Sequence, residues 1–388
     1  MKLRNYARFV FLNRQGLTKF WLACGLSFGL AACGSGGAGA NSPGASSPTA
    51  QAGSQPAPLR IVSTPNPSVF PLLLAMAQNP NLPVSLVPVA TGSDIVASFS
   101  AGKGDGLLSM TYTAAQDVAN GSIPNLQLVS VNYWSGFWML APKSANITNF
   151  SQLTGEGVLV AGPTSGGKGG GPDLIFQAAA KRAGYGAANF NVCYLPVMEA
   201  AQMILQQQPM SSNPACNASF TQPPTAISLV EPSATGLVMD SVMSGGASGP
   251  IVKVIDYQNL FTGYTAWPQN QLPHGGVSFL STVLNDPARQ QNVKTLLTAY
   301  RAAADAIMAA KGNPLAMSQI ANTLSTGIAT YYGQYNLSIP ASVISAALMS
   351  GDFVYRTDLT LPAIQSDLAA FLSEVVGTAP PASFYEPL

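Results

Sequence analysis

The sequence predicts an α/β protein of two lobes, each a mainly parallel sheet flanked by helices, with a helical C-terminal region. Short apolar strands alternate with helices in two successive series, the first from residue 59 and the second from residue 157. Helical periodicity then prevails from Asp286 onward. The roughly 330 residues from position 59 to the end are enough for two lobes. A cleft between lobes is a common place for a ligand.

The first series begins after residue 58 with repeated strand and helix units. We expect strands at 59–63, 84–88, 106–110 and 126–131, and helices at 68–78, 92–101 and 111–120. Strands joined through helices pair in parallel, and such sheets hold ligands at the carboxyl ends of their strands. The turns expected at these ends are rich in hydroxyl groups. They supply the first candidate ligand-binding residues, which are Thr64, Asn66, Ser68, Gly92, Ser93 and Thr111.

Four aromatic residues lie where the chain is expected to pass between the lobes, in the stretch from Tyr133 to Trp138. Aromatic rings at such a place wall a ligand or stack on it. Alternation along the chain implies that about half of these rings pack into the lobe cores instead. Trp134 is the candidate for a ligand contact.

The second series opens with the stretch from Gly157 to Asp173, which comprises a short apolar strand, a glycine-rich loop and the start of a helix. Pro172 and Asp173 favour the helix start, so free N–H groups and the positive helix end face one hollow. Such a hollow holds an anion or a strongly polar group. The candidate ligand-binding residues of this loop are Ser165, Gly166 and Gly167.

The same loop nearly matches two catalytic motifs. Gly162 to Lys168 fits the G-x-x-x-x-G-K part of a phosphate-binding loop, but Gly169 stands where Ser or Thr would hold magnesium. Ser165 and Lys168 fit the S-x-x-K motif of serine acylation. Two glycines between them remove the rigid helix that this motif needs, and no S-D-N triplet follows. We therefore expect neither a nucleotide site nor a penicillin-recognising hydrolase.

The remaining strands are expected at 191–195, 226–230, 251–255 and 275–280, and the remaining helices at 197–206, 288–311, 314–324, 340–348 and 361–376.

Glu231 follows a strand end. There its carboxylate either accepts a hydrogen bond from a ligand or caps the helix that starts at Ser233, and both readings stay open. His274 is the only histidine, and its Pro-His-Gly-Gly setting predicts a turn with a solvated or locally bonded ring. No G-x-S-x-G elbow accompanies it, so we predict no serine-hydrolase triad and no enzyme.

Residues 1–32 have the pattern of a secretory signal peptide, because basic residues precede an uncharged apolar run from Phe20 to Ala32. The run is too short to span a bilayer. It ends Leu-Ala-Ala-Cys, which resembles the lipobox of bacterial lipoproteins and predicts a lipid such as palmitate on Cys33; an ordinary signal is the alternative. Residues 33–58 are mostly small and polar and predict a flexible tether. We expect a membrane anchor in the cell envelope, facing the periplasm or the outside.

Removal of the signal leaves 12 Lys and Arg, the 17 of the full chain less five, against 16 Asp and Glu. This net negative charge of the exported chain argues against nucleic acid as a partner.

Besides the lipid site Cys33, the exported chain keeps two cysteines, Cys193 and Cys216. They predict a disulfide, with two unrelated buried thiols as the alternative. We expect the bridge to pin an insertion at 207–224 that borders the cleft. With one histidine, the chain has too few ligands for a metal site, and we expect no metal and no cofactor.

Several stretches occur in an order that is typical of one family, and they are Leu59 to Val62, Ala90 to Asp94, Ile147 to Gly155, Gly171 to Phe176 with Lys181 to Gly184, Val230 to Thr235, and Ala379 to Tyr385. With these stretches, the chain from residue 59 to 388 resembles the periplasmic solute-binding proteins of the nitrate, sulfonate and thiamine-precursor type, which feed ABC importers.

The resemblance implies a type II periplasmic-binding-protein fold, with 59–135 as the first part of lobe I, 136–274 as lobe II and 275–388 as the second part of lobe I. It implies a monomer that closes on a small molecule and delivers it to an ABC-transporter permease. The ligand stays open among a sulfonate, a nitrate-like anion and a thiamine-precursor-like heteroaromatic. Two alternatives also stay open, an enzyme of thiamine-precursor or menaquinone type on the same fold and an envelope scaffold with a vestigial cleft.

Overall fold

The computed structural model describes residues 57–162 and 167–388, and residues 57–388 form one compact unit. The expected signal peptide, the tether up to residue 56 and the lipid site Cys33 lie outside the described residues. Ser165 and Gly166 of the glycine-rich loop also lie outside them. Within the described ranges, no helix is both long enough and apolar enough to cross a membrane.

The first sheet is built on the expected parallel strands and has the order β11-β4-β10-β3-β1-β2. Its strands are β1 (Leu59–Ser63), β2 (Val84–Pro88), β3 (Gly106–Met110), β4 (Leu126–Ser135), β10 (Pro273–Leu280) and β11 (Phe353–Tyr355). β1 pairs in parallel with β2 and β3, whereas β10 runs antiparallel between β3 and β4. β4 continues to Ser135, beyond the expected end at residue 131, and the short edge strand β11 was not predicted.

The second sheet has the order β7-β6-β8-β5-β9. Its strands are β5 (Phe137–Pro142), β6 (Gly157–Gly162), β7 (Asn191–Pro196), β8 (Ala226–Val230) and β9 (Ile251–Asp256). β6 pairs in parallel with β7 and β8, and β5 runs antiparallel to β8 and β9. β5 was not predicted as a strand. Each sheet is therefore mainly parallel, and the antiparallel strands are β10 and β11 in the first sheet and β5 in the second.

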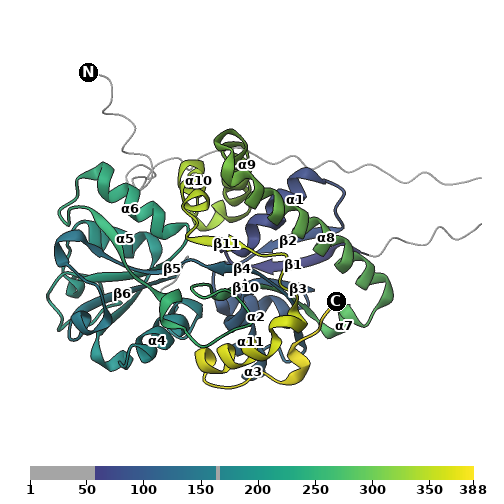
Figure 1. The fold of residues 1–388 in the computed structure, drawn as a ribbon, viewed down its shortest axis with the longest axis horizontal. Coiled ribbons are helices and arrows are strands. Elements are labelled where there is room, and N and C mark those ends of the chain that lie inside the picture. Colours follow the sequence, from purple (N-terminus) through teal and green to yellow (C-terminus); the bar gives the residue numbers. More distant parts are fainter. Residues whose placement is uncertain (1–56, 163–166) are drawn as a thin grey trace, which may run out of the picture. The chain divides into compact units, whose positions relative to one another are not determined.

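Helices cover both faces of each sheet (Figure 1). They are α1 (Phe70–Gln78), α2 (Gly92–Ser100), α3 (Thr111–Ala119), α4 (Gly171–Arg182), α5 (Val197–Leu205), α6 (Ser233–Ser244), α7 (Ser281–Leu284), α8 (Pro287–Ala309), α9 (Pro314–Tyr332), α10 (Ala341–Ser350) and α11 (Leu361–Val376). The helical C-terminal region is confirmed. α9 runs to Tyr332, past the expected end at residue 324.

The chain crosses from the first sheet to the second between β4 and β5. Ser135 and Gly136 make this crossing with positive φ angles of 67° and 101°. A Cβ atom on Gly136 would lie 2.3 Å from the Tyr133 hydroxyl, so only glycine fits there. The segment 257–272 returns the chain to β10 in the first sheet. The predicted lobe boundaries lie near these two crossings and stay a prediction.

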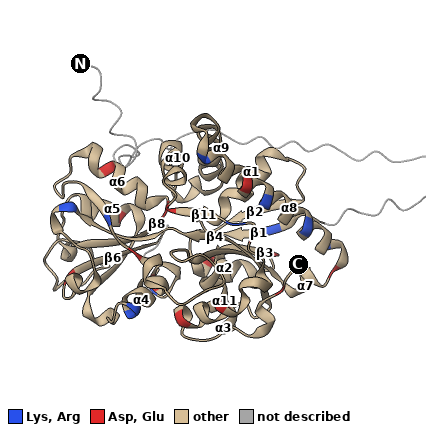
Figure 2. Ribbon diagram, in the orientation of Figure 1, with Lys and Arg blue, Asp and Glu red and all other residues tan. Residues whose placement is uncertain are grey.

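Charged residues make up 9% of the sequence and are sparse along the ribbon (Figure 2). Two acidic side chains, Asp117 on α3 and Asp240 on α6, are nonetheless buried. One carboxylate oxygen of each finds no hydrogen-bond partner in the described part of the chain. Burial raises the pKa of both carboxyl groups to about 6.

We expect Asp117 and Asp240 to make the fold less stable as pH rises. Their pKa is raised on folding, so their contribution is complete below the ordinary value of 3.8 and is lost as pH rises through about 6. Between about pH 5 and pH 8 each should cost about 1.4 kcal/mol of unfolding free energy. Asp117→Asn and Asp240→Asn should each remove that dependence in urea unfolding. Glu199→Gln, at an exposed site, is the control, and an unchanged pH dependence in the double variant would contradict the prediction.

Candidate functional site

The turn between β1 and α1 is held by tyrosines from the C-terminal region. The hydroxyl of Tyr300 on α8 donates to the carbonyl of Ser68 at 2.6 Å, and that of Tyr355 on β11 donates to the carbonyl of Pro67 at 2.7 Å. Tyr332 on α9 donates to the carbonyl of Ser63 at 3.2 Å. All three tyrosines are buried. The turn that we predicted as a binding element is therefore rigidly placed by residues more than two hundred positions away.

Two of the predicted binding residues stabilise this turn from inside. Asn66 donates to the carbonyl of Thr64 at 2.8 Å and accepts from the backbone N–H of Ser68 at 2.9 Å. Asn66 and Ser68 are buried, whereas Thr64 is half-buried. In this form, Thr64 has the most surface of the three for a ligand.

Ser68 lies directly against Gly275 of β10, and this contact sets a requirement for glycine. A Cβ atom on Gly275 would lie 2.0 Å from the Ser68 Oγ and 2.7 Å from the Tyr133 Cβ. We expect Gly275→Ala to lower the unfolding free energy by about 1–3 kcal/mol, because overpacking forces the turn and strand apart. Urea unfolding measures this. Gly312→Ala, where no atom lies within 4 Å of the new Cβ, is the control and should be nearly neutral.

The other predicted residues of the first sheet divide into exposed and buried ones. Gly92 and Ser93 are exposed at the start of α2, next to a capping box in which Thr91 and Asp94 bond each other. Thr111 is buried, and its hydroxyl donates to the carbonyl of Pro273 at 2.5 Å. Thr111 thus joins the start of α3 to β10 and offers no accessible atom to a ligand in this structure.

Trp134 does not have the predicted position at a ligand. Its side chain is 0% exposed, and its ring packs 5.5 Å from that of Trp267. The reason is that β4 extends through this residue, between β10 and β11, so the side chain points into a covered face of the sheet. Among the four aromatic residues, Trp138 is the one with exposed surface.

His274 lies in β10 and not in a turn, which corrects the prediction. The ring is 0% exposed, and burial lowers its pKa to about 3, so it is neutral. Its Nε2 lies 3.4 Å from the Oε1 of Gln258, which also accepts from the Phe137 N–H at 3.2 Å. The ring therefore packs as part of the core, 4.8 Å from the ring of Phe137. The two glycines that follow the histidine suggested a turn, but here they allow close strand packing.

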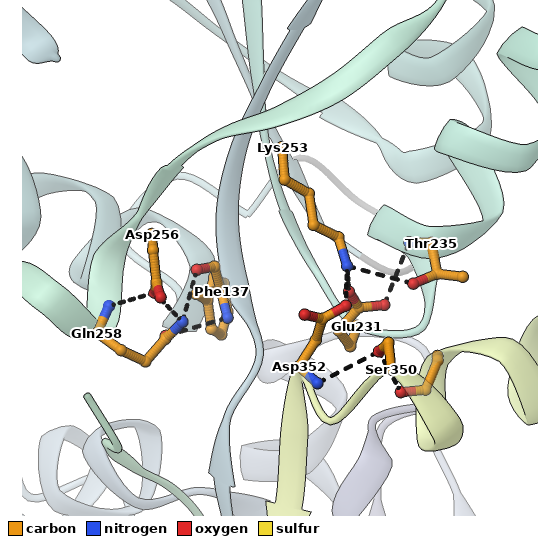
Figure 3. A network of polar contacts seen from close by, with 9 residues as sticks. Phe137, Glu231, Thr235, Lys253, Asp256, Gln258, Ser350 and Asp352 are labelled. Atoms are coloured by element: carbon orange, nitrogen blue, oxygen red, sulfur yellow. Dashed lines mark hydrogen bonds and ion pairs between the residues drawn. The ribbon is translucent and has the colours of Figure 1, made fainter. Parts of the chain in front are cut away.

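Glu231 lies at the end of β8 in a network of polar contacts (Figure 3). Its carboxylate is 0% exposed and pairs with the ammonium of Lys253 on β9. It also accepts a hydrogen bond from the backbone N–H of Thr235 at 3.2 Å. Glu231 therefore caps α6, which is one of the two roles expected for it. Burial raises the pKa of Glu231, and the nearby Lys253 lowers it in part.

Lys253 links the two sheets. Besides Glu231, its ammonium pairs with Asp352, which immediately precedes β11 of the first sheet (Figure 3). It also lies 5.0 Å from the ring centroid of Trp138, in a cation–π contact. One lysine thus joins two carboxylates from different sheets. The spacing of charges in the sequence did not predict that Lys253 pairs with Glu231 and Asp352, or that it connects the two sheets.

A small cavity of about 30 Å³ lies where the turn after β1 meets the end of β8. Its lining residues are Pro65, Asn66, Pro67, Phe70, Val197, Val230, Glu231, Pro232, Ser233, Ile328, Leu337 and Ile339. They come from the turn after β1 with the start of α1, from the end of β8 with the start of α6, from α5, and from α9 and the segment that follows it. The structure therefore brings Asn66 and Glu231, two predicted binding residues, to one cavity.

The end of the glycine-rich loop lies against the first sheet. A Cβ atom on Gly171 would lie 2.7 Å from the Met110 sulfur and 3.0 Å from the Thr113 hydroxyl oxygen. Gly167 is half-buried. The buried carboxylate of Asp173 accepts from the Gly169 N–H at 2.7 Å. The protein's own acid thus takes up one of the N–H groups that we expected to bind an anion.

The insertion at 207–224 does not border the cavity. Met210 and Phe220 pack on Gly157, at the start of β6, whereas the cavity lies at the carboxyl ends of the strands. The reason is topological: the insertion precedes β8, which is parallel to β6, so it must lie at the opposite edge of the sheet. Cys193 and Cys216 form the predicted disulfide, which ties the insertion to β7.

Solved structures of periplasmic binding proteins share this fold. One is the aliphatic sulphonate-binding protein SsuA from Escherichia coli, at 16% identity, with a TM-score of 0.55 over 83% of this chain and 86% of that chain. Another is the alkanesulfonate-binding SsuA from Xanthomonas axonopodis pv. citri bound to MOPS, at 14% identity, with a TM-score of 0.55 over 86% and 99%. A third is a ligand-binding component of an ABC-type import system from Staphylococcus aureus with zinc bound. It has 13% identity and a TM-score of 0.56 over 85% of this chain and 97% of that chain.

The chain therefore has the two-lobed type II periplasmic-binding-protein fold that was predicted. The structures most similar to it include SsuA-like binding proteins and ligand-binding components of ABC importers. No protein-family model matches the sequence, and no curated protein matches it. At these low identities the likeness establishes the fold.

Proposed function

We propose that the chain is an extracytoplasmic solute-binding protein that captures a small molecule between its lobes and delivers it to an ABC importer. The observation that carries this proposal is the cavity at which the turn after β1 meets the strand end at Glu231. Two separate sheets contribute to it, as hinged capture of a solute requires. The proposal includes the lobe boundaries after residues 135 and 274, a monomeric state and a lipid anchor at Cys33.

Capture needs the lobes to move apart. The cavity of about 30 Å³ has room for about one or two water molecules. A larger solute therefore enters when the two sheets separate and is buried when they close again. The contacts that open in this motion include the ion pair between Lys253 and Asp352.

For the ligand, we propose a neutral or cationic heteroaromatic molecule in preference to a sulfonate or a nitrate-like anion. Among the described residues that line the cavity, Glu231 carries the ionisable group, and Arg and Lys are absent. Most of the lining is apolar and includes the ring of Phe70. A buried anion needs a cation or free N–H donors, and Asp173 already accepts from Gly169.

A thermal-shift screen with pyrimidines, flavins, sulfonates and nitrate tests this function. A heteroaromatic ligand present at about 100 times its Kd should stabilise the protein by about 2.7 kcal/mol. Val197→Trp, which fills the cavity, should abolish that shift. Val242→Trp, at a side chain that is 66% exposed, is the matched control and should keep it.

Two results would overturn the proposal. If no solute raises the melting temperature, the cleft is vestigial and the chain is a scaffold of the envelope. If a compound that stabilises the protein is converted to a product, the chain is an enzyme on this fold. A sulfonate that stabilises the protein with loss in Val197→Trp would retain the function and reject the proposed ligand class.

A further inference from the structure

A second pocket, of about 350 Å³, lies beside β4 in the first sheet, between α8 and the segment that follows β11. Its lining residues are Val129, Ser130, Asn132, Leu297, Tyr300, Arg301, Arg356, Thr357, Leu359, Thr360, Leu361, Pro362, Pro387 and Leu388. None of them lines the cavity at Glu231. The volume is in the range of small-molecule sites, which starts at about 300 Å³.

Asn132 gives this pocket an unusual polar group. The side chain is 3% exposed, and neither its amide nitrogen nor its amide oxygen has a hydrogen-bond partner among the residues that the structure describes. Its main-chain carbonyl accepts from the Arg356 N–H at 3.0 Å, so the strand is firmly placed. A buried amide is costly unless a partner satisfies it. Asn132 thus brings a buried donor and a buried acceptor, both without partners among the described residues, to the lining of this pocket.

Two arginines supply positive charge to the same pocket. The guanidinium of Arg356 is held by Asp358 at 2.7 and 2.5 Å and by the Gln271 Oε1 at 3.1 Å. Its charge is therefore balanced. Arg301 on α8 is exposed, and no carboxylate in the described ranges forms an ion pair with it. Arg301 is thus the cation that can accept an anionic partner.

The rest of the wall is largely aliphatic. Leu297, Leu359 and Leu361 line the pocket together with prolines. Such a surface suits an apolar body that is attached to the polar group. The pocket therefore combines a guanidinium, an amide with a free donor and acceptor, and an aliphatic wall.

We propose that this pocket is a second small-molecule site, which binds a 2-hydroxy carboxylate with a branched aliphatic body. The carboxylate accepts hydrogen bonds from the Arg301 guanidinium and from the Nδ2 of Asn132. The 2-hydroxyl donates to the Oδ1 of Asn132. A neutral hydroxyl suits this place better than an amine, because an ammonium ion would lie near Arg301 and Arg356. Planar, bidentate recognition of a carboxylate is the usual role of arginine.

Isothermal titration calorimetry on the purified protein with 2-hydroxy-4-methylpentanoate tests the proposal. Two analogues separate the polar groups: 4-methylpentanoate lacks the hydroxyl, and 2-hydroxy-4-methylpentanamide lacks the charge. Each should bind at least about tenfold more weakly. Arg301→Gln should weaken binding of the hydroxy acid by a similar factor. Lys294→Gln, which removes an exposed charge from the same helix, should not.

Asn132→Leu provides a second test. It should abolish binding of the hydroxy acid, and it should raise the melting temperature, because the leucine needs no hydrogen-bond partner. If this variant does not fold, Arg301→Gln still decides. The proposal is overturned if the hydroxy acid does not bind, if an ordered water alone satisfies Asn132, or if Arg301→Gln leaves binding unchanged. It is also overturned if Val197→Trp abolishes binding, because the hydroxy acid then binds at the interlobe cavity.

Discussion

Replacing Lys253 with methionine is expected to lower the free energy of unfolding by about 3–5 kcal/mol. The substitution leaves the carboxylate of Glu231, which is 0% exposed, without the cation that neutralises it. It also removes the ion pair to Asp352, which joins the second sheet to the first. Urea unfolding followed by circular dichroism measures the loss.

The loss in Lys253→Met should depend on pH. Burial raises the pKa of Glu231 above its ordinary value of 4.5, and removal of Lys253 raises it further. An acid whose pKa is raised on folding stabilises the fold below that ordinary value, and this contribution is lost as pH rises through the folded pKa. The deficit of Lys253→Met should therefore be larger at about pH 8 than at about pH 4.5.

Two variants control this experiment. Lys143→Met removes an exposed lysine directly after β5 of the same lobe and should change stability by less than about 0.5 kcal/mol. Adding Glu231→Gln to Lys253→Met should recover most of the lost stability, because the buried group is then neutral. A loss of less than about 1 kcal/mol that is the same at both pH values would show that Glu231 does not depend on Lys253.

Removing the Cys193–Cys216 disulfide is expected to cost about 3 kcal/mol. The two cysteines are 23 positions apart, and the bridge limits the freedom of that loop in the unfolded chain. Cys193→Ala with Cys216→Ser should show this loss in urea unfolding. Reduction of the native protein with dithiothreitol should reproduce it.

The disulfide variant also tests the position of the insertion. Because 207–224 packs at the start of β6, away from the cavity, the affinity for a captured solute should stay within about twofold of the native value. A large loss of affinity would mean that the insertion reaches the ligand after all. Equal stability with and without the bridge would contradict the first part of the prediction.

Elements with strong local patterns were predicted well. β1, β2, β3 and β8 have the expected bounds, as does α11. Each is a short, largely apolar strand or a long amphipathic helix with turn residues on either side, so neighbours in sequence are enough to define it. Besides Cys33, the predicted lipid site, Cys193 and Cys216 are the remaining cysteines of the predicted exported chain, and their pairing followed.

Elements that depend on distant partners were missed or misplaced. β11 has only three residues and is a strand because β4 offers it an edge. Trp134 and His274 were placed at a ligand and in a turn, but both lie in strands that other elements cover. The three tyrosines on the turn after β1 had no signal in the sequence, because their hydroxyl partners are main-chain carbonyls far away in the chain.

Local patterns in the chain were sufficient to predict the α/β class, the two series of strands, the helical C-terminal region and the pairing of Cys193 with Cys216. They follow from hydrophobic periodicity and from composition, which are properties of neighbouring residues. The partners of Lys253, the burial of Trp134 and the edge to which the insertion belongs became evident only in three dimensions. Those depend on which strand ends meet, and sheet order is set by contacts between residues that are remote in sequence.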